Sequence, residues 1–181
     1  KDVLMNRRPV IFLLATFAML WGNRPTQAIT SAPSWKPRQL VSPSAQGVYH
    51  DGSDRILAYD HWGNPGIVYQ ASAIDDLMYA RMIDGVGWRA GVVDDVNGGF
   101  YPSLAFDRYE RPVISAVSYS GTAVRAYTLS GLSWSSAVVD SVAGDFRYTS
   151  LAIDSTGKPA VAFYNNNIGG QLRYAKDTDI D

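Results

Sequence analysis

The chain has 181 residues and a formal net charge of -1, so no global electric field attracts nucleic acid or an anionic membrane surface. It contains no cysteine, which excludes disulfides, thiolate metal sites and cysteine nucleophiles. Its hydrophobic content of 46% is that of a globular protein, and Glu110 is its single glutamate beside many aspartates. Because Asp favours turns and Glu favours helix interiors, this balance indicates strands joined by many turns.

Residues 1–28 have the pattern of a secretory signal peptide. A basic pair follows Met5, an apolar run occupies 10–21, and the small residue Ala28 ends a polar stretch. We therefore expect translation to start at Met5, cleavage after Ala28, and a secreted or periplasmic protein with no membrane attachment after cleavage. The alternative is an uncleaved membrane anchor, although a spanning helix needs about 20 apolar residues and this run is shorter.

Residues 29–46 form an N-terminal segment in which we expect one isolated outer strand. Trp35 is followed there by the apolar pair Leu40 and Val41. The same order, a tryptophan and then an apolar pair, recurs twice later in the chain.

Three copies of one sequence pattern follow. They span 47–95, 96–140 and 141–181. Each contains Leu-Ala-x-Asp, beginning at Leu57, Leu104 and Leu151, so the copies are offset by 47 residues (104 − 57 = 47 and 151 − 104 = 47). In each copy a proline comes five residues after the Asp and opens an apolar run. A fixed repeat of this length indicates one supersecondary unit per copy.

A third run, Leu-x-Tyr-Ala, begins at Leu77 in the first copy and at Leu172 in the third, and it is degenerate in the middle copy, where the sequence from Val124 differs. The first two copies also contain Gly-x-x-Trp before Val-Val-Asp. The tryptophans are Trp88 and Trp134, and we expect their rings to fill the space between neighbouring repeats. Each copy thus predicts four short strands, with proline at the start of the second strand, where it removes no interior hydrogen bond.

These observations predict an all-β fold, a β-propeller built from four-stranded blades of about 47 residues. About three blades are present, fewer than the four to eight of a closed ring. We expect the chain to be a fragment of a longer protein or, if it is complete, one of several copies that form a ring as a homo-oligomer.

The pattern Ser-Leu-Ala-x-Asp, Gly-x-Pro, Leu-x-Tyr-Ala and Trp with Val-Val-Asp resembles repeats of secreted bacterial β-propellers, over residues from about 35 to 176. It is loosely similar to the sialidase-like and fucose-lectin-like superfamilies. The resemblance implies a propeller and contact with carbohydrate. The sialidase Asp-box is absent, since Asp154-Ser155-Thr156-Gly157 has different spacing and lacks the aromatic residue, so no catalytic residue is carried over.

Five residues are predicted to bind a ligand. Tyr101 and Tyr148 occupy equivalent positions before the first strand of their copies (148 − 101 = 47), with Asp54 in that place in the first copy and Arg147 beside Tyr148. Asn165 lies in the loop after the second strand of the third copy. Aromatic rings that cover the apolar C–H faces of a sugar, with polar groups for its hydroxyls, suit carbohydrate. The alternative is that the tyrosines pack between blades.

The repeated Asp60, Asp107 and Asp154 are interpreted as turn caps rather than metal ligands. His50 and His61 are the only histidines and are expected in loops without a paired partner, which gives a zinc site or a Ser-His-Asp triad little support. We predict no metal and no cofactor.

The function predicted from these features is an exported β-propeller binding module, non-catalytic, for a glycan or a cell-surface protein. One alternative is part of a sialidase-like glycoside hydrolase, and another is a structural or adhesive repeat protein. A hydrolase needs paired carboxylates. Only Asp54, Asp145 and Glu110 are candidates, and Glu110 falls in a turn at the opposite end of its strand.

Overall fold

A computed structural model describes residues 48–49, 55–71, 75–96, 98–142, 144–167 and 169–178. These residues all belong to one compact unit, Gln39–Asp181. The predicted signal peptide, the outer strand expected within 29–46, and His50 and Asp54 lie outside the described residues. No helix in the described part of the chain is long and apolar enough to cross a membrane.

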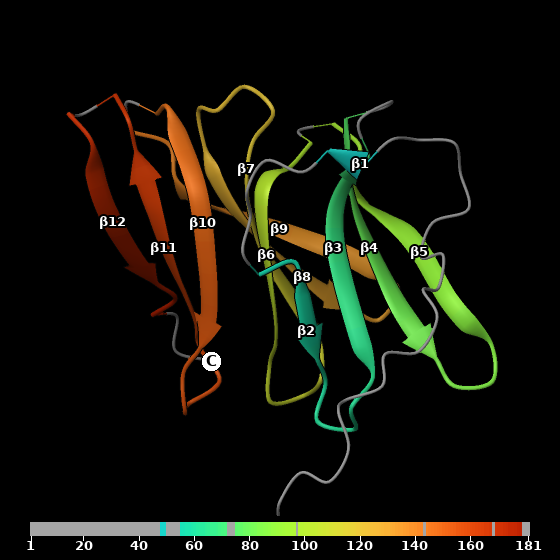
Figure 1. The fold of residues 1–181 in the computed structure, drawn as a ribbon. Coiled ribbons are helices and arrows are strands. Elements are labelled where there is room, and N and C mark those ends of the chain that lie inside the picture. Colours follow the sequence, from blue (N-terminus) through green and yellow to red (C-terminus); the bar gives the residue numbers. More distant parts are fainter. Residues whose placement is uncertain are drawn as a thin grey trace, which may run out of the picture. The chain divides into compact units, whose positions relative to one another are not determined.

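The fold is all-β, with three antiparallel sheets that follow one another along the chain (Figure 1). Sheet 1 contains β1 (Val48–Tyr49), β2 (Leu57–Tyr59), β3 (Pro65–Ala71), β4 (Asp76–Ile83) and β5 (Gly87–Asp94). Sheet 2 contains β6 (Phe100–Phe106), β7 (Pro112–Val117), β8 (Val124–Ser130) and β9 (Ser133–Asp140). Sheet 3 contains β10 (Phe146–Ile153), β11 (Pro159–Asn165) and β12 (Gln171–Lys176).

The expected start of the second strand is confirmed in every sheet, because β3, β7 and β11 each begin at the proline of the repeat. The first strand differs in sheet 1. There it is present as two pieces, β1 and β2, which both pair with β3.

The pairing registers fix which residues of the three sheets are equivalent. Leu77, Val124 and Leu172 occupy equivalent positions on the third strands of the three sheets. Their pairing partners on β3, β7 and β11 are spaced by 47 residues along the chain. By the same comparison Tyr79 corresponds to Ala126 and to Tyr174. The degenerate middle copy of the third strand is therefore aligned by its hydrogen bonding, although its sequence differs.

Two hydrophobic cores lie between the sheets. The first joins Val68, Leu77 and Tyr79 of sheet 1 to sheet 2, where Leu104 and Ile114 meet them. The second core lies between sheets 2 and 3, and the side chains that sheet 2 contributes to it alternate along the strand with those that face sheet 1. The buried members of the second core are Val113, Val117, Val124, Phe146, Leu151, Val161 and Phe163. β7 of sheet 2 is thus buried on both faces, as its near-continuous apolar run Pro112–Val117 requires.

Packing between the sheets is densest at the first strands, because β6 contacts both β2 and β10. Arg55, just before β2, donates from its guanidinium to the Leu151 carbonyl of β10 at 3.3 Å. The first strands of all three sheets therefore converge, and β5 and β9 are the outermost strands of sheets 1 and 2.

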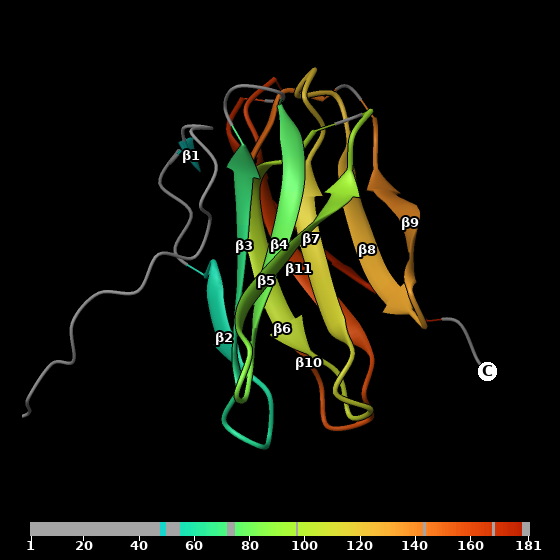
Figure 2. The same ribbon diagram turned by 90° about the vertical axis from the view of Figure 1, so that its right-hand side faces the viewer.

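The connections between strands gather at two opposite ends, as an up-and-down order of antiparallel strands requires (Figure 2). The β2–β3, β6–β7 and β10–β11 turns share one end. The β7–β8 and β9–β10 connections share the other, which carries the candidate site.

Candidate functional site

Tyr101 and Tyr148 each occupy a β-bulge in the first strand of their sheet. In the pairing of β6 with β7, Phe100 lies opposite Val117 and the next pair is Ser103 with Ser115, so two residues of β6 lie opposite one residue of β7. The pairing of β10 with β11 has the same irregularity after Arg147. Both tyrosines have left-handed backbone, with φ of 50° and 54°. This conformation costs a non-glycine residue about 1–2 kcal/mol, and a bulge re-aims the side chain that it carries.

Buried hydroxyl groups hold these two bulges together. The Thr149 hydroxyl of β10 donates to the Tyr101 carbonyl at 2.7 Å, and the Ser115 hydroxyl of β7 donates to Thr149 at 2.8 Å. The Leu151 backbone N–H donates to the hydroxyl of Ser103 at 3.0 Å. Thr149, Ser103 and Ser115 are all buried. Hydrogen bonds in such a dry layer are costly to break, so they fix how sheets 2 and 3 are placed against each other.

The bulge tyrosines belong to a row of four aromatic rings that crosses from sheet 2 to sheet 3. Tyr119 in the β7–β8 turn stacks on Phe100 at 5.6 Å, Phe100 lies 6.3 Å from Tyr101, and Tyr101 lies 4.8 Å from Tyr148. The two end members, Tyr119 and Tyr148, are more than half exposed. The row therefore offers ring faces to solvent at both of its ends.

A groove of about 320 Å³ lies along three rings of this row, and the fourth, Tyr148, contacts Tyr101 beside the groove. Phe100, Tyr101 and Tyr119 line one part of it, and Asp145 and Arg147, which flank the start of β10, line another. The wall thus combines rings with one cationic and one anionic group.

The polar groups of the groove are linked to one another. Arg147 lies 3.4 Å from the Asp145 carboxylate, and the side-chain amide of Asn166 donates to the same carboxylate at 2.7 Å. The Asn166 bond and then the Arg147 guanidinium hold the pKa of Asp145 below its usual value. The contact with Asp145 raises the pKa of Arg147 in turn. Asp145 is therefore an ionised acceptor at neutral pH, not a proton donor.

Of the five predicted site residues, Tyr101 and Arg147 line the groove, and Tyr148 contacts Tyr101 beside it. Asn165 differs from the expectation, because it ends β11 with no exposed surface and donates inward to the Val142 carbonyl at 3.4 Å. Strand alternation points Asn165 into the protein and leaves its neighbour Asn166 outside. Asp54 lies outside the described residues.

The pairing register makes Tyr49 of β1 in sheet 1 the equivalent of Phe100 in sheet 2 and of Arg147 in sheet 3. Tyr49 pairs with Gln70, Phe100 with Val117 and Arg147 with Tyr164, and these three partners are spaced by 47 residues.

Sequence comparison missed Tyr119, whereas Asn166 belongs to the same run of asparagines from which Asn165 was chosen. Both residues lie in connections that differ between the copies, so no repeat spacing marks them. The available signal was their place beside an aligned tyrosine in the connections of one end.

The turn-cap interpretation of the repeated aspartates is confirmed. Asp60, Asp107 and Asp154 each accept backbone N–H bonds within their own turn. Burial alone would raise the pKa of Asp60, but bonds from Asn64 and Arg81 outweigh it and lower that pKa. No cluster of metal-binding side chains occurs among the residues that the structure describes.

The expectation that His61 lacks a partner is wrong. Its Nδ1 lies 2.6 Å from the Glu110 carboxylate of the neighbouring turn. A repeat comparison does not reveal this contact, because Glu110 stands where the other two copies have glycine.

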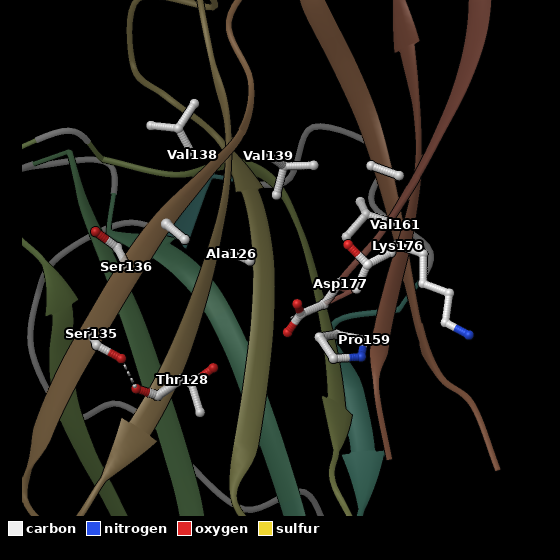
Figure 3. Close-up of a pocket in the computed structure, with 13 residues that line it drawn as sticks. Ala126, Thr128, Ser135, Ser136, Val138, Val139, Pro159, Val161, Lys176 and Asp177 are labelled. Carbon is white, nitrogen blue, oxygen red and sulfur yellow. Dashed lines mark hydrogen bonds between the residues drawn. The ribbon is translucent and has the colours of Figure 1, made fainter. Parts of the chain in front are cut away.

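A second, more apolar groove of about 400 Å³ separates the outer parts of sheets 2 and 3 (Figure 3). Ala126 and Val138 lie on the β8–β9 side, and Val161 and Lys176 on the β11–β12 side. The corresponding space between sheets 1 and 2 is filled by rings, since Trp134 meets Tyr79 edge-on at 5.6 Å.

Two small residues account for this second groove. Ala126 is the equivalent of Tyr79, and Ala175 is the equivalent of Tyr127, a ring that is 2% exposed in the first core. Sheet 3 also has no described outer strand to bring in a tryptophan. Trp134 packs against the first core, as expected, and Trp88 on β5 is half-buried like Trp134.

No protein-family model and no curated protein matches this sequence. Among solved structures, the chain is similar to a protein of unknown function from Dyadobacter fermentans DSM 18053, with a TM-score of 0.51 and 18% identity over 66% of this chain. This chain spans 35% of the length of that protein. The likeness shows a shared fold.

Two further solved structures are similar at lower TM-scores. A fucose lectin from Kordia zhangzhouensis in complex with methyl-fucoside has a TM-score of 0.44 and 12% identity, covering 69% of this chain and 98% of the lectin. The GH93 alpha-L-arabinofuranosidase of Fusarium graminearum with arabinobiose has a TM-score of 0.48 and 15% identity, covering 72% of this chain and 47% of the enzyme.

Proposed function

We propose that the three sheets are successive blades of a β-propeller and that the chain is an exported, non-catalytic carbohydrate-binding module. The blade assignment is supported by three antiparallel sheets that pack face to face with their first strands converging. The sequence pattern of residues 1–28 supports export.

The observation that carries the proposal is the pair of strained tyrosines. Tyr101 and Tyr148 come from two different sheets, both hold left-handed backbone, and their rings lie 4.8 Å apart beside a groove. Backbone strain of this kind persists where the surrounding structure enforces it, and it concentrates at functional sites. A purely structural ring at these positions would not require more than half of Tyr148 to face solvent.

The chemistry of the groove suits a sugar. Exposed ring faces at Tyr119 and Tyr148 cover the apolar C–H side of a pyranose, as aromatic side chains do in carbohydrate sites. Arg147 and Asn166 supply donors and Asp145 supplies acceptors for hydroxyl groups. These groups already hydrogen-bond to one another, so they are placed before a ligand arrives.

The alternative of a glycoside hydrolase is less well supported by this groove. Such an enzyme uses two carboxyl groups on either side of the scissile bond, one of them protonated. Among the residues that the structure describes, Asp145 is the only carboxylate that lines the groove, and its lowered pKa keeps it ionised. Glu110 lies in the β6–β7 turn at the other end of the sheets.

A glycan array on the full chain tests the proposal, followed by titration calorimetry with the best glycan. We expect Tyr148→Ala and Tyr119→Ala each to weaken binding by about tenfold or less, the worth of one aromatic contact. Tyr109→Ala is the matched control, because Tyr109 is 62% exposed but lies in the β6–β7 turn. Binding that no groove variant changes, or an array without any bound glycan, would contradict the proposal and leave a protein ligand or a structural repeat.

A further inference from the structure

Sheets 1 and 3 carry the same two side chains at equivalent positions, but only sheet 1 buries them. Leu77 and Leu172 correspond, as do Tyr79 and Tyr174, each pair 95 residues apart (172 − 77 = 95 and 174 − 79 = 95). Leu77 is 0% and Tyr79 is 9% exposed, because sheet 2 covers them. Leu172 is 80% and Tyr174 is 68% exposed. The outward face of sheet 3 thus repeats a face that is covered elsewhere in this chain.

Sheet 1 exposes the complementary half of the same contact. Leu57, Leu104 and Leu151 are equivalent residues of the first strands. Leu104 faces sheet 1 and is 3% exposed, and Leu151 faces sheet 2 and is 0% exposed. Leu57 pairs with Ile67 and therefore lies on the same face of sheet 1 as Ile67. Because neighbouring side chains along a strand point to opposite faces and Val68 faces sheet 2, Leu57 faces away from sheet 2. Leu57 is 49% exposed.

We propose that these two faces bind each other between two copies of this chain, head to tail. The outward face of sheet 3 in one copy, with Leu172 and Tyr174, packs on the outward face of sheet 1 in a second copy. The contact repeats the one between sheets 1 and 2. In it Tyr174 meets Trp88 of the second copy as Tyr79 meets Trp134 within one chain.

The partner is identified by what the face of sheet 3 requires. It must present a leucine on its first strand and a tryptophan on its outer strand, in the register of sheet 2. Sheet 1 of another copy has both, in Leu57 and the half-buried Trp88. Because the two faces differ, the contact is heterologous, and it forms closed rings only where the rotation between copies closes.

Other exposed apolar residues provide controls. Leu132 is fully exposed in the β8–β9 turn, and Val96 is 82% exposed after β5. At the positions equivalent to Leu132 and Val96, the residues that the structure describes in the other copies of the repeat bury no side chain between sheets. A charge placed at Leu132 therefore alters surface hydrophobicity without touching the proposed contact.

Sedimentation velocity of the full chain over a range of concentrations tests the contact. We expect concentration-dependent association of the unchanged chain. Leu57→Lys and Tyr174→Lys should each weaken it by at least about tenfold, because each would bury an unpaired charge. Leu132→Lys should leave association unchanged. Leu57 is about half exposed and the other two positions are mostly exposed, and equal melting temperatures verify that the variants fold.

Mixing the two weakened variants tests the head-to-tail geometry. Leu57→Lys retains an intact sheet 3 face and Tyr174→Lys retains an intact sheet 1 face, so an equimolar mixture should restore one contact and form a heterodimer. A monomer at every concentration would overturn the proposal. So would association that is lost only in Leu132→Lys, or two variants that fail to complement, since complementation requires two different faces. A monomer whose Tyr174 is protected from hydroxyl-radical labelling would instead place another segment of the same chain over sheet 3.

Discussion

His61 and Glu110 join the β2–β3 turn of sheet 1 to the β6–β7 turn of sheet 2. The Nδ1 atom of His61 lies 2.6 Å from Oε1 of Glu110, and the His61 backbone N–H donates to Oε2 at 2.9 Å. Glu110 has φ of 61°, at the position where the other copies have Gly63 and Gly157, each with φ of 86°. A strained glutamate has thus replaced a relaxed glycine and gained a contact with the neighbouring sheet.

This relationship predicts different effects for two small substitutions. Glu110→Ala loses the contact and keeps the left-handed strain, so we expect it to lower the free energy of unfolding by about 1 kcal/mol or less. Glu110→Gly loses the same contact but relieves the strain, and it should be about 1 kcal/mol more stable than the alanine variant. Urea denaturation measures both. Equal stability of the two variants would mean that residue 110 does not hold left-handed backbone in solution.

The two repeated tryptophans should differ in their effect on stability. Trp134 packs against Tyr79 within the first core, so Trp134→Ala should lower the free energy of unfolding by about 2–3 kcal/mol, less than for a fully buried ring. Trp88→Ala should cost less when measured at low protein concentration, because Trp88 pairs with Met82, on the face of sheet 1 opposite to Tyr79 and thus away from the first core. Urea melts of both variants compare them directly. A larger loss for Trp88→Ala would contradict the packing described for sheets 1 and 2.

Filling the second groove should stabilise the protein. Ala175→Tyr places a ring where sheet 2 has Tyr127, and the groove of about 400 Å³ has room for it. We expect an increase of about 0.5–2 kcal/mol in the free energy of unfolding, the usual range for cavity filling. Ala90→Tyr on β5, at an exposed site, is the matched control and should change little. A destabilised Ala175→Tyr would show that the groove closes when the protein is in solution.

Asp76 predicts a pH dependence of stability that is opposite in sign to that of Asp60. Burial, and then the charges of Asp95, Asp75 and Asp94, raise its pKa. A carboxyl group whose pKa is higher in the folded state than in the unfolded state binds its proton more tightly when folded. Its ionisation therefore costs stability at neutral pH, and this cost disappears as the pH falls below its unfolded value.

Asp76→Asn should accordingly raise the free energy of unfolding at pH 7, by less than about 1 kcal/mol, and the gain should shrink as the solution is acidified toward pH 3. Asp60→Asn is the contrast, because the pKa of Asp60 is lowered by bonds from Asn64 and Arg81 that outweigh its burial. It should lose stability at pH 7 and less at low pH. Thermal melts across this range measure both, and a gain for Asp76→Asn that persists at pH 3 would exclude a charge effect.

The repeat made much of the fold predictable. A spacing of 47 residues located the second strands, because proline at the start of a strand and Leu-Ala-x-Asp before a turn are local signals. It also aligned Tyr101 with Tyr148. It could not show that both hold positive φ, since a bulge arises from the count of residues opposite the neighbouring strand and not from the residue types alone.

The rest of the site depends on contacts between copies that differ. Tyr119 stacks on Phe100 from a connection whose sequence has no counterpart in the other repeats. Asn165 was expected to face a ligand, but the strand extends one residue further than its sequence suggests and turns that side chain inward. Glu110 and His61 are 49 residues apart and belong to different copies, so only their placement in space brings them together.

The layer formed by Ser103, Ser115 and Thr149 limits how freely the copies could be exchanged. Between sheets 1 and 2 the rings of Tyr79, Tyr127 and Trp134 pack together, and the Tyr127 hydroxyl donates to the Asp94 carboxylate at 2.9 Å. Between sheets 2 and 3 the contact at the first strands is made by buried hydroxyl groups that bond to the Tyr101 carbonyl and the Leu151 N–H. Duplicating the second copy in tandem would set Pro102, the equivalent of Thr149, against Ser115 and remove the donor to the Tyr101 carbonyl. The modules share one backbone plan, yet each boundary has become specific to its own pair of neighbours.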